Sequence, residues 1–131
     1  MLRLDHVLIL ARDLNLTASF LRAAAGLADG PRPAFPFAGH WLYAGGRPLI
    51  HLAGAADPAN AGYLGAPQTC GSAVDHIAFS GAGRDGLVAR LTQQGIAFFE
   101  REVPETGERQ IFVPGPDGLK LEFLFPSRRT P

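Results

Sequence analysis

The chain has 131 residues, of which 47% are hydrophobic and 18% are charged, a balance that is typical of one compact domain and excludes an intrinsically disordered chain. Twelve basic and twelve acidic side chains give a formal net charge of +0. The sequence therefore lacks the basic surface that holds a phosphate backbone, and no nucleic-acid partner is expected.

No segment indicates export or insertion into a membrane. Asp5 and His6 break the first apolar run, which is untypical of a signal peptide, and no stretch reaches the length of a membrane span. Cys70 is the only cysteine, so it cannot form an internal disulfide, and a lone thiol fits a reducing compartment. We expect a cytoplasmic protein without a membrane partner.

The first elements in chain order are a strand and a helix. Apolar residues alternate over 2–10, which is typical of a strand with two different faces. Asp13 and Asn15 are candidates for the start of a helix, and Gly26 is a candidate for its left-handed end. Between these limits, apolar residues recur at helical spacing, at Leu16, Phe20, Leu21 and Ala24.

A hairpin is predicted next, after an irregular segment. Three prolines interrupt residues 31–36, so any strand there should lie at a sheet edge. Residues 40–44 and 48–53 are predicted to form two strands, because two glycines at 45–46 separate them and such a pair favours a tight hairpin turn.

The second half of the chain predicts the same order of elements. Residues 54–72 are rich in alanine, glycine and proline and should connect the halves. The elements expected after them are a strand, a helix, a strand and a hairpin, over 73–80, 83–94, 96–103 and 109–113 with 119–125. The sequence thus predicts an α+β fold, one domain of two βαβββ modules, at about 1–53 and 73–126.

Two short motifs occur once in each module. Leu-Asp-His-Val at 4–7 returns as Val-Asp-His-Ile at 74–77, seventy residues later. His51 stands between two apolar residues, as Glu122 does seventy-one residues later. Internal repeats are informative about architecture, so the polar residues of the two motifs should occupy equivalent positions of two similar modules.

These motifs supply three imidazoles and one carboxylate, from His6, His51, His76 and Glu122. Strand alternation separates all four from their apolar neighbours, so they should share the sheet face that the helices leave uncovered. A buried carboxylate there requires a cation or water. Imidazole and carboxylate ligands suit Fe, Mn, Co, Ni or Zn, and the sequence predicts a divalent metal ion. Taken singly, each histidine is more often a surface or hydrogen-bonded residue.

Other residues are candidates for substrate contact or for structural roles. By alternation, Lys120 shares the face of Glu122 and could neutralise an anion. Arg109 flanks the same hairpin, and solubility explains either cation equally well. Asp5 and Asp75 should project away from the histidines beside them and satisfy backbone donors instead. Aromatic rings that could line an apolar pocket, or simply pack in the core, are Phe35, Phe37, Trp41, Tyr43 and Phe112.

The paired modules, the two Asp-His openings and the closing Pro-Asp-Gly-Leu-Lys-Leu-Glu-Phe at 116–123 resemble the vicinal oxygen chelate superfamily. This superfamily includes glyoxalase I, methylmalonyl-CoA epimerases, extradiol dioxygenases, fosfomycin-modifying enzymes and bleomycin-binding proteins. The resemblance covers nearly the whole chain. It implies a curved, partly open mixed sheet with the helices on its outer face, a metal site, a small-molecule substrate and a homodimer.

The resemblance leaves three functions open. We favour a glyoxalase-like lyase or isomerase, in which a metal chelates two neighbouring substrate oxygens and Glu122 or neutral His51 acts as the base. His6, His76 and Glu122 also match the facial triad of an extradiol dioxygenase, although Phe112 stands where those enzymes have a tyrosine and they are commonly twice as long. The third is a metal-free drug-binding protein of the bleomycin resistance type, which has no need of these ligands.

Overall fold

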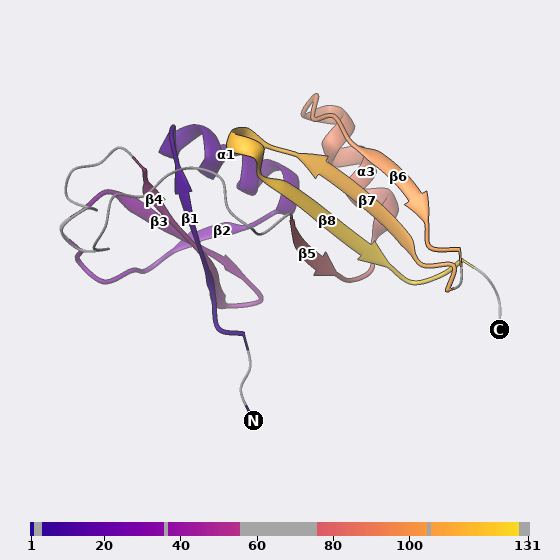
Figure 1. Cartoon of the computed structure of the whole chain (residues 1–131), viewed down its shortest axis with the longest axis horizontal. Helices are drawn as coiled ribbons and strands as arrows, with labels where there is room; N and C mark the ends of the chain where they lie inside the picture. Colours follow the sequence, from indigo (N-terminus) through magenta and orange to yellow (C-terminus); the bar gives the residue numbers. More distant parts are fainter. Residues whose placement is uncertain (2–3, 36, 56–75, 105, 129–131) are drawn as a thin grey trace. The chain divides into compact units, whose positions relative to one another are not determined.

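The computed structural model describes residue 1 and residues 4–35, 37–55, 76–104 and 106–128. The chain divides into two compact units, Met1–Gly71 and Ser72–Pro131. Each contains one open four-stranded mixed sheet (Figure 1), so the predicted α+β fold is confirmed. The described helices all lack the length and apolar surface needed to span a bilayer. Cys70, Asp75 and most of the predicted connection lie outside the described residues.

The first unit consists of β1 (Val7–Ala11), α1 (Leu14–Ala25), β2 (Ala28–Gly30), β3 (Gly39–Ala44) and β4 (Arg47–Gly54). The strands lie in the order β1-β4-β3-β2. β1 runs parallel to β4, and the other neighbours are antiparallel. Helix α1 packs against β1, β3 and β4, which leaves one face of this sheet without a helix from its own unit.

Helix α1 is capped by the residues that the sequence indicates. The Asp13 carboxylate accepts a hydrogen bond from the backbone N–H of Leu16 at 2.9 Å, and Gly26 ends the helix with a φ of 68°. Leu16 follows the helical spacing that the sequence indicates, but its side chain is 55% exposed. The buried stripe of α1 consists of Thr17, Ala18, Leu21 and Ala24. Leu16 lies about 100° around the helix from Thr17 and so falls outside this stripe.

The hairpin between β3 and β4 is confirmed. Gly45 and Gly46 form its two-residue turn with φ values of 58° and 76°. Both angles are left-handed, as the tight hairpin turn requires, and glycine adopts them without steric cost. The preceding edge strand β2 has only three residues and contains no proline. The prolines at 31 and 33 follow it, and the described residues there form no strand.

The second unit consists of β5 (Ile77–Ser80), α3 (Arg84–Gln93), β6 (Phe99–Glu102), β7 (Arg109–Pro114), the short 3-10 helix η1 (Pro116–Gly118) and β8 (Lys120–Phe125). Its strand order β5-β8-β7-β6 repeats that of the first unit. The first and last strands are again parallel neighbours. The two predicted modules therefore share one topology.

The registers of the two sheets place the motif residues at equivalent positions. His51 pairs with Leu8 of β1, and Glu122 pairs with Ala78 of β5. Both first strands are shorter than predicted, because they begin only at Val7 and Ile77. Residues 6 and 76 consequently precede the strands instead of lying within them.

Each unit has its own core on the face covered by its helix. The neighbours of His51 in sequence, Ile50 and Leu52, are only 2% exposed. In the second unit the fully buried side chains include Leu91 of α3 and three strand residues, Ile111, Val113 and Leu121. Apolar side chains thus alternate with the polar motif residues, as a two-faced sheet requires.

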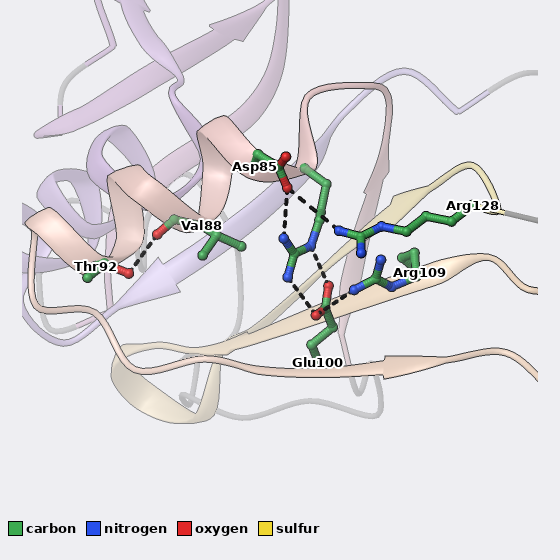
Figure 2. A network of polar contacts seen from close by, with 7 residues as sticks. Asp85, Val88, Thr92, Glu100, Arg109 and Arg128 are labelled. Carbon is green, nitrogen blue, oxygen red and sulfur yellow. Dashed lines mark hydrogen bonds and ion pairs between the residues drawn. The ribbon is translucent and has the colours of Figure 1, made fainter.

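An ion-pair network attaches α3 to its sheet (Figure 2). Arg84 binds Glu100 of β6 through two hydrogen bonds of 2.7 Å, and Arg109 of β7 binds the same carboxylate at 2.7 Å. The hydrogen bonds from Arg84, and then from Arg109, hold the pKa of Glu100 below its usual value. One carboxylate therefore joins the helix to two strands.

Candidate functional site

In the second unit, His76 and Glu122 are in direct contact. His76 Nε2 lies 3.0 Å from Glu122 Oε1. Glu122 is only 7% exposed, whereas the side chain of His76 is 37% exposed. A buried carboxylate oxygen and an accessible imidazole nitrogen that meet at one point are a donor pair that a divalent metal ion could bridge, so these residues fit the predicted ligands.

A second contact fixes the Glu122 carboxylate from the other side. The side-chain amide of Gln110 donates a hydrogen bond to Glu122 Oε2 at 3.0 Å, and Arg101 Nε donates to Gln110 Oε1 at 3.0 Å. This chain of donors leaves Oε1 directed at His76. Gln110 was not identified as a site residue from the sequence. Strand alternation could have indicated it, because Gln110 shares a face of β7 with Phe112, and Phe112 is paired with Glu122.

Phe112 supplies the apolar surroundings of this pair. It is paired with Glu122 in the register and is 5% exposed. Its ring meets His76 edge-on, with centroids 6.3 Å apart, and stacks on Phe99 at 5.0 Å. The Arg101 guanidinium lies 4.9 Å from the same ring. The structure thus places Phe112 beside the candidate ligands, and its contact with a substrate stays a prediction.

In the first unit, His51 lies between two aromatic rings. The Trp41 ring stacks on one side and the His6 ring on the other, each with a centroid distance of 3.9 Å. His51 Nε2 is 3.1 Å from the Pro48 carbonyl oxygen, which can only accept, so Nε2 carries the proton. Burial, and then the neighbouring His6, lower the pKa of His51, which favours its neutral form.

This stacking limits how the two imidazoles can serve one metal ion. The lone pair of an imidazole nitrogen lies in the ring plane, and a ligated metal lies in that plane about 2.1 Å from the nitrogen. The planes of His6 and His51 are only 12° from parallel, so an ion in one plane lies outside the other. In this arrangement, one ion can be bound by either ring but not by both.

His6 is better placed than His51 to be that ligand. Its Nδ1 lies 2.7 Å from a carboxylate oxygen of Asp5, and this contact assigns the ring proton to Nδ1 and the lone pair to Nε2. Carboxylates commonly orient metal-binding histidines in this way. The hydrogen bond from His6 is also the largest cause of the lowered pKa of Asp5.

The expectation that Asp5 projects away from His6 is therefore wrong. Strand alternation does not apply to these two residues, because β1 begins only at Val7. The backbone before the strand brings the two side chains together. Asp75, the equivalent residue of the second module, lies outside the described residues.

The two predicted cations of the second unit occupy different faces of its sheet. Lys120 stands two residues from Glu122 on β8, so it shares the face of that carboxylate. Arg109 stands three residues from Phe112 on β7 and projects to the opposite face, where it binds Glu100. The structure does not bring Arg109 to the candidate ligands.

Tyr43 is held in the first unit by packing and by one hydrogen bond. Its hydroxyl donates to the Pro31 carbonyl oxygen at 2.6 Å. Its ring covers Gly30 so closely that a Cβ atom there would lie 2.4 Å from it. These contacts fasten β3 to the segment after β2, and a role of Tyr43 in substrate binding stays a prediction.

The candidate ligands occur as pairs within each unit. Among the described residues, no three histidine, cysteine, aspartate or glutamate side chains gather into a group that could hold a metal ion. The first unit contributes His6 and His51, and the second contributes His76 and Glu122. Metal binding accordingly stays a prediction, although the imidazole and carboxylate groups of these residues are of the types that bind divalent metal ions.

Comparisons with known proteins identify the fold. No family model and no curated protein matches the sequence. A solved glyoxalase family protein from Bacillus anthracis is 21% identical, with a TM-score of 0.73 over 97% of both chains. A glyoxalase/bleomycin resistance protein/dioxygenase from Nocardioides is 18% identical, with a TM-score of 0.71 over 99% of this chain and 87% of that one.

A third similar structure is a fosfomycin resistance protein, FosX, from Listeria monocytogenes. A mutant of FosX, solved with Mn(II) and 1S,2S-dihydroxypropylphosphonic acid, is 18% identical to this chain, with a TM-score of 0.70 over 98% of this chain and 96% of that one. At 18–21% identity, these likenesses show that this chain shares the fold of these three proteins.

Proposed function

We propose that this protein is a divalent-metal-dependent enzyme, a glyoxalase-like lyase or isomerase that acts on a small oxygenated substrate. The contact of His76 with buried Glu122 at 3.0 Å is the observation that supports this most. His6, with its Asp5 partner, is the proposed third ligand. The manganese-bound FosX structure supports a divalent metal, because it has the same fold.

The bound metal would act as a Lewis acid toward two neighbouring substrate oxygens. The residues of the chain then have separate tasks. Gln110 holds Glu122 Oε2 and so keeps Oε1 directed at His76. Neutral His51 keeps its proton on Nε2, so its Nδ1 has the lone pair that could accept a proton from a substrate carbon.

A metal-free binding protein for flat molecules is the second candidate. The stacked rings of Trp41, His51 and His6 favour it, because such a surface suits an aromatic ligand.

An extradiol dioxygenase is the third candidate, because its facial triad of two histidines and one carboxylate matches His6, His76 and Glu122. Against it, Phe112 stands where those enzymes have a tyrosine, and phenylalanine has no hydroxyl group. Either function is compatible with the proposed homodimer, which a solution mass twice that of the chain would support.

Elemental analysis of the purified protein, followed by metal titration of three variants, tests the proposal. His76→Ala and Glu122→Gln should each lose metal, because each removes one ligand. His40→Ala is the matched control, since His40 contacts Asp29 at 3.2 Å and is not a proposed ligand. Unchanged metal binding in His76→Ala and Glu122→Gln would contradict the metal site and favour the binding protein.

A further inference from the structure

Arg32 carries a positive charge without a carboxylate partner in the part of the chain that the structure describes. Its guanidinium lies 5.2 Å from the ring centroid of Phe35 and 5.3 Å from that of Phe37. Nη2 donates to the Phe37 carbonyl oxygen at 3.1 Å, and Nε is buried without a hydrogen-bond partner among the described residues. Arg22, by contrast, binds Asp29 at 2.6 Å. A half-buried cation that, among residues the structure describes, contacts two rings and a carbonyl oxygen but no carboxylate requires an explanation.

The guanidinium lies on the same face of the sheet as Trp41. A Cβ atom added to Gly39 would lie 2.4 Å from the Leu52 carbonyl oxygen and 3.3 Å from Arg32 Nη2, so the arginine borders the position where residue 39 has no side chain. Gly39 and Trp41 are two residues apart on β3, and side chains with that spacing share a face. The Phe35 ring also lies 6.3 Å from the Trp41 ring.

Arg32 therefore belongs to a continuous surface of the first unit, which we call the arginine-aromatic surface. It runs from the guanidinium through Phe35 to Trp41 and from there, by direct stacking, to His51 and His6. One end is cationic, the middle is aromatic, and the other end holds a proposed metal ligand. A ligand with an anionic group at one end and an apolar part at the other could therefore contact the guanidinium and the rings at the same time.

We propose that Arg32 binds the anionic group, a carboxylate or a phosphonate, of a small organic ligand whose apolar part lies against Trp41. Arginine suits this task because its planar guanidinium binds oxyanions through paired hydrogen bonds. The rings of Phe35 and Phe37 hold it in place, so little side-chain entropy is lost on binding. This inference rests on the proposed function, in which the ligand is the substrate, and it assigns the substrate to the organic anions.

Isothermal titration calorimetry on the full-length protein, freed of metal with a chelator, tests this directly. The probes are phenylphosphonate and benzoate, with benzyl alcohol as the neutral comparison. We expect saturable binding of at least one anion, no binding of the alcohol, and a change in the fluorescence of Trp41, the only tryptophan. If neither anion binds to the wild-type protein, the proposal is wrong.

Three variants locate the binding. Arg32→Gln should weaken anion binding about tenfold or more, because it removes a charge-assisted hydrogen bond. Arg32→Lys keeps the charge without the planar donors and should bind with intermediate affinity. Arg47→Gln removes the same charge from an exposed position of the same unit and should change the affinity less than about twofold. If both Arg32→Lys and Arg32→Gln bind the anion with wild-type affinity, the proposal is overturned. If Arg32→Gln does not fold, the anion affinity of Arg32→Lys alone tests the proposal.

The two proposals can fail separately. Anion binding is measured without metal, so it does not depend on His76 or Glu122. Loss of metal in His76→Ala with no anion binding in the wild-type protein would leave the enzyme proposal and remove Arg32 from it. Anion binding that requires Arg32 in a protein without metal affinity would instead favour a binding protein for organic anions.

Discussion

Glu122 and His51 occupy the same register position in two similar sheets, yet their surroundings differ. Each lies opposite an aromatic residue on the neighbouring strand, Phe112 in one sheet and Trp41 in the other. Glu122 accepts a hydrogen bond from Gln110 and contacts His76, whereas His51 lies between the rings stacked on its two sides. Equivalent positions of the repeat therefore place a carboxylate among polar side chains in one sheet and an imidazole between rings in the other.

Replacing Gln110 tests whether the orientation of Glu122 matters for metal binding. Gln110→Ala removes the hydrogen bond to Glu122 Oε2 and should lower the metal affinity about tenfold to a hundredfold, the usual effect of losing a residue that orients a ligand. Gln93→Ala, at an exposed position near the end of α3, is the control. Competition with a chelating dye measures both, and equal affinities in the two variants would exclude an orienting role.

Asp5 is expected to act on the metal through His6. Asp5→Asn keeps the size of the side chain but weakens its hold on the Nδ1 proton of His6. The metal affinity should fall about tenfold, with the overall stability nearly unchanged because Asp5 is exposed. Asp85→Asn removes an exposed carboxylate of the other unit and should leave metal binding as it is. A metal titration at neutral pH in which both variants match the wild-type protein would refute this link.

Two replacements of His51 distinguish the stacking of its ring from its candidate roles as a base or a metal ligand. His51→Phe keeps a ring between Trp41 and His6, so metal affinity should change less than about threefold, whereas His51→Ala removes the stack and should lower it more. If His51 is the base, both variants should lose about a hundredfold in kcat once a substrate is known. Metal affinity lost equally in both variants would show that His51 is itself a ligand.

The local signals in the sequence predicted most of the fold but only part of the site. Caps and tight turns depend on neighbouring residues, so Asp13, Gly26 and the glycine pair at 45–46 were identified correctly. Spacing alone could not show that β1 begins after His6, and the contact with Asp5 was missed for that reason.

Side-chain pairing across strands was the other part that spacing could not predict. Arg109 was a candidate for substrate binding, but its partner Glu100 lies on the adjacent strand β6 and fixes it on the far face. Arg32 was not singled out, because its contacts with the rings of Phe35 and Phe37 form only in the folded unit. The candidate ligands, in contrast, were visible because the repeat marks them twice.

The carboxylate of Glu100 should stabilise the second unit in a pH-dependent way. Its pKa in the folded protein lies below the ordinary value of 4.5, chiefly because Arg84 donates hydrogen bonds to it. The folded state therefore favours the ionised form. This stabilisation is fully present above pH 4.5 and is lost as the pH falls below that value through the folded pKa.

Glu100→Gln keeps the shape of the side chain and removes the charge that joins Arg84 to Arg109 (Figure 2). We expect a loss of about 1–2 kcal/mol at pH 7, since the pairs are partly exposed and therefore partly screened. Glu102→Gln, on the same strand but exposed, should cost less than about 0.5 kcal/mol. Urea denaturation followed by circular dichroism at pH 7 and pH 3 measures the difference, which should shrink at the lower pH because wild-type Glu100 is then increasingly protonated. A difference of equal size at both pH values would mean that packing, and not charge, is the contribution of Glu100.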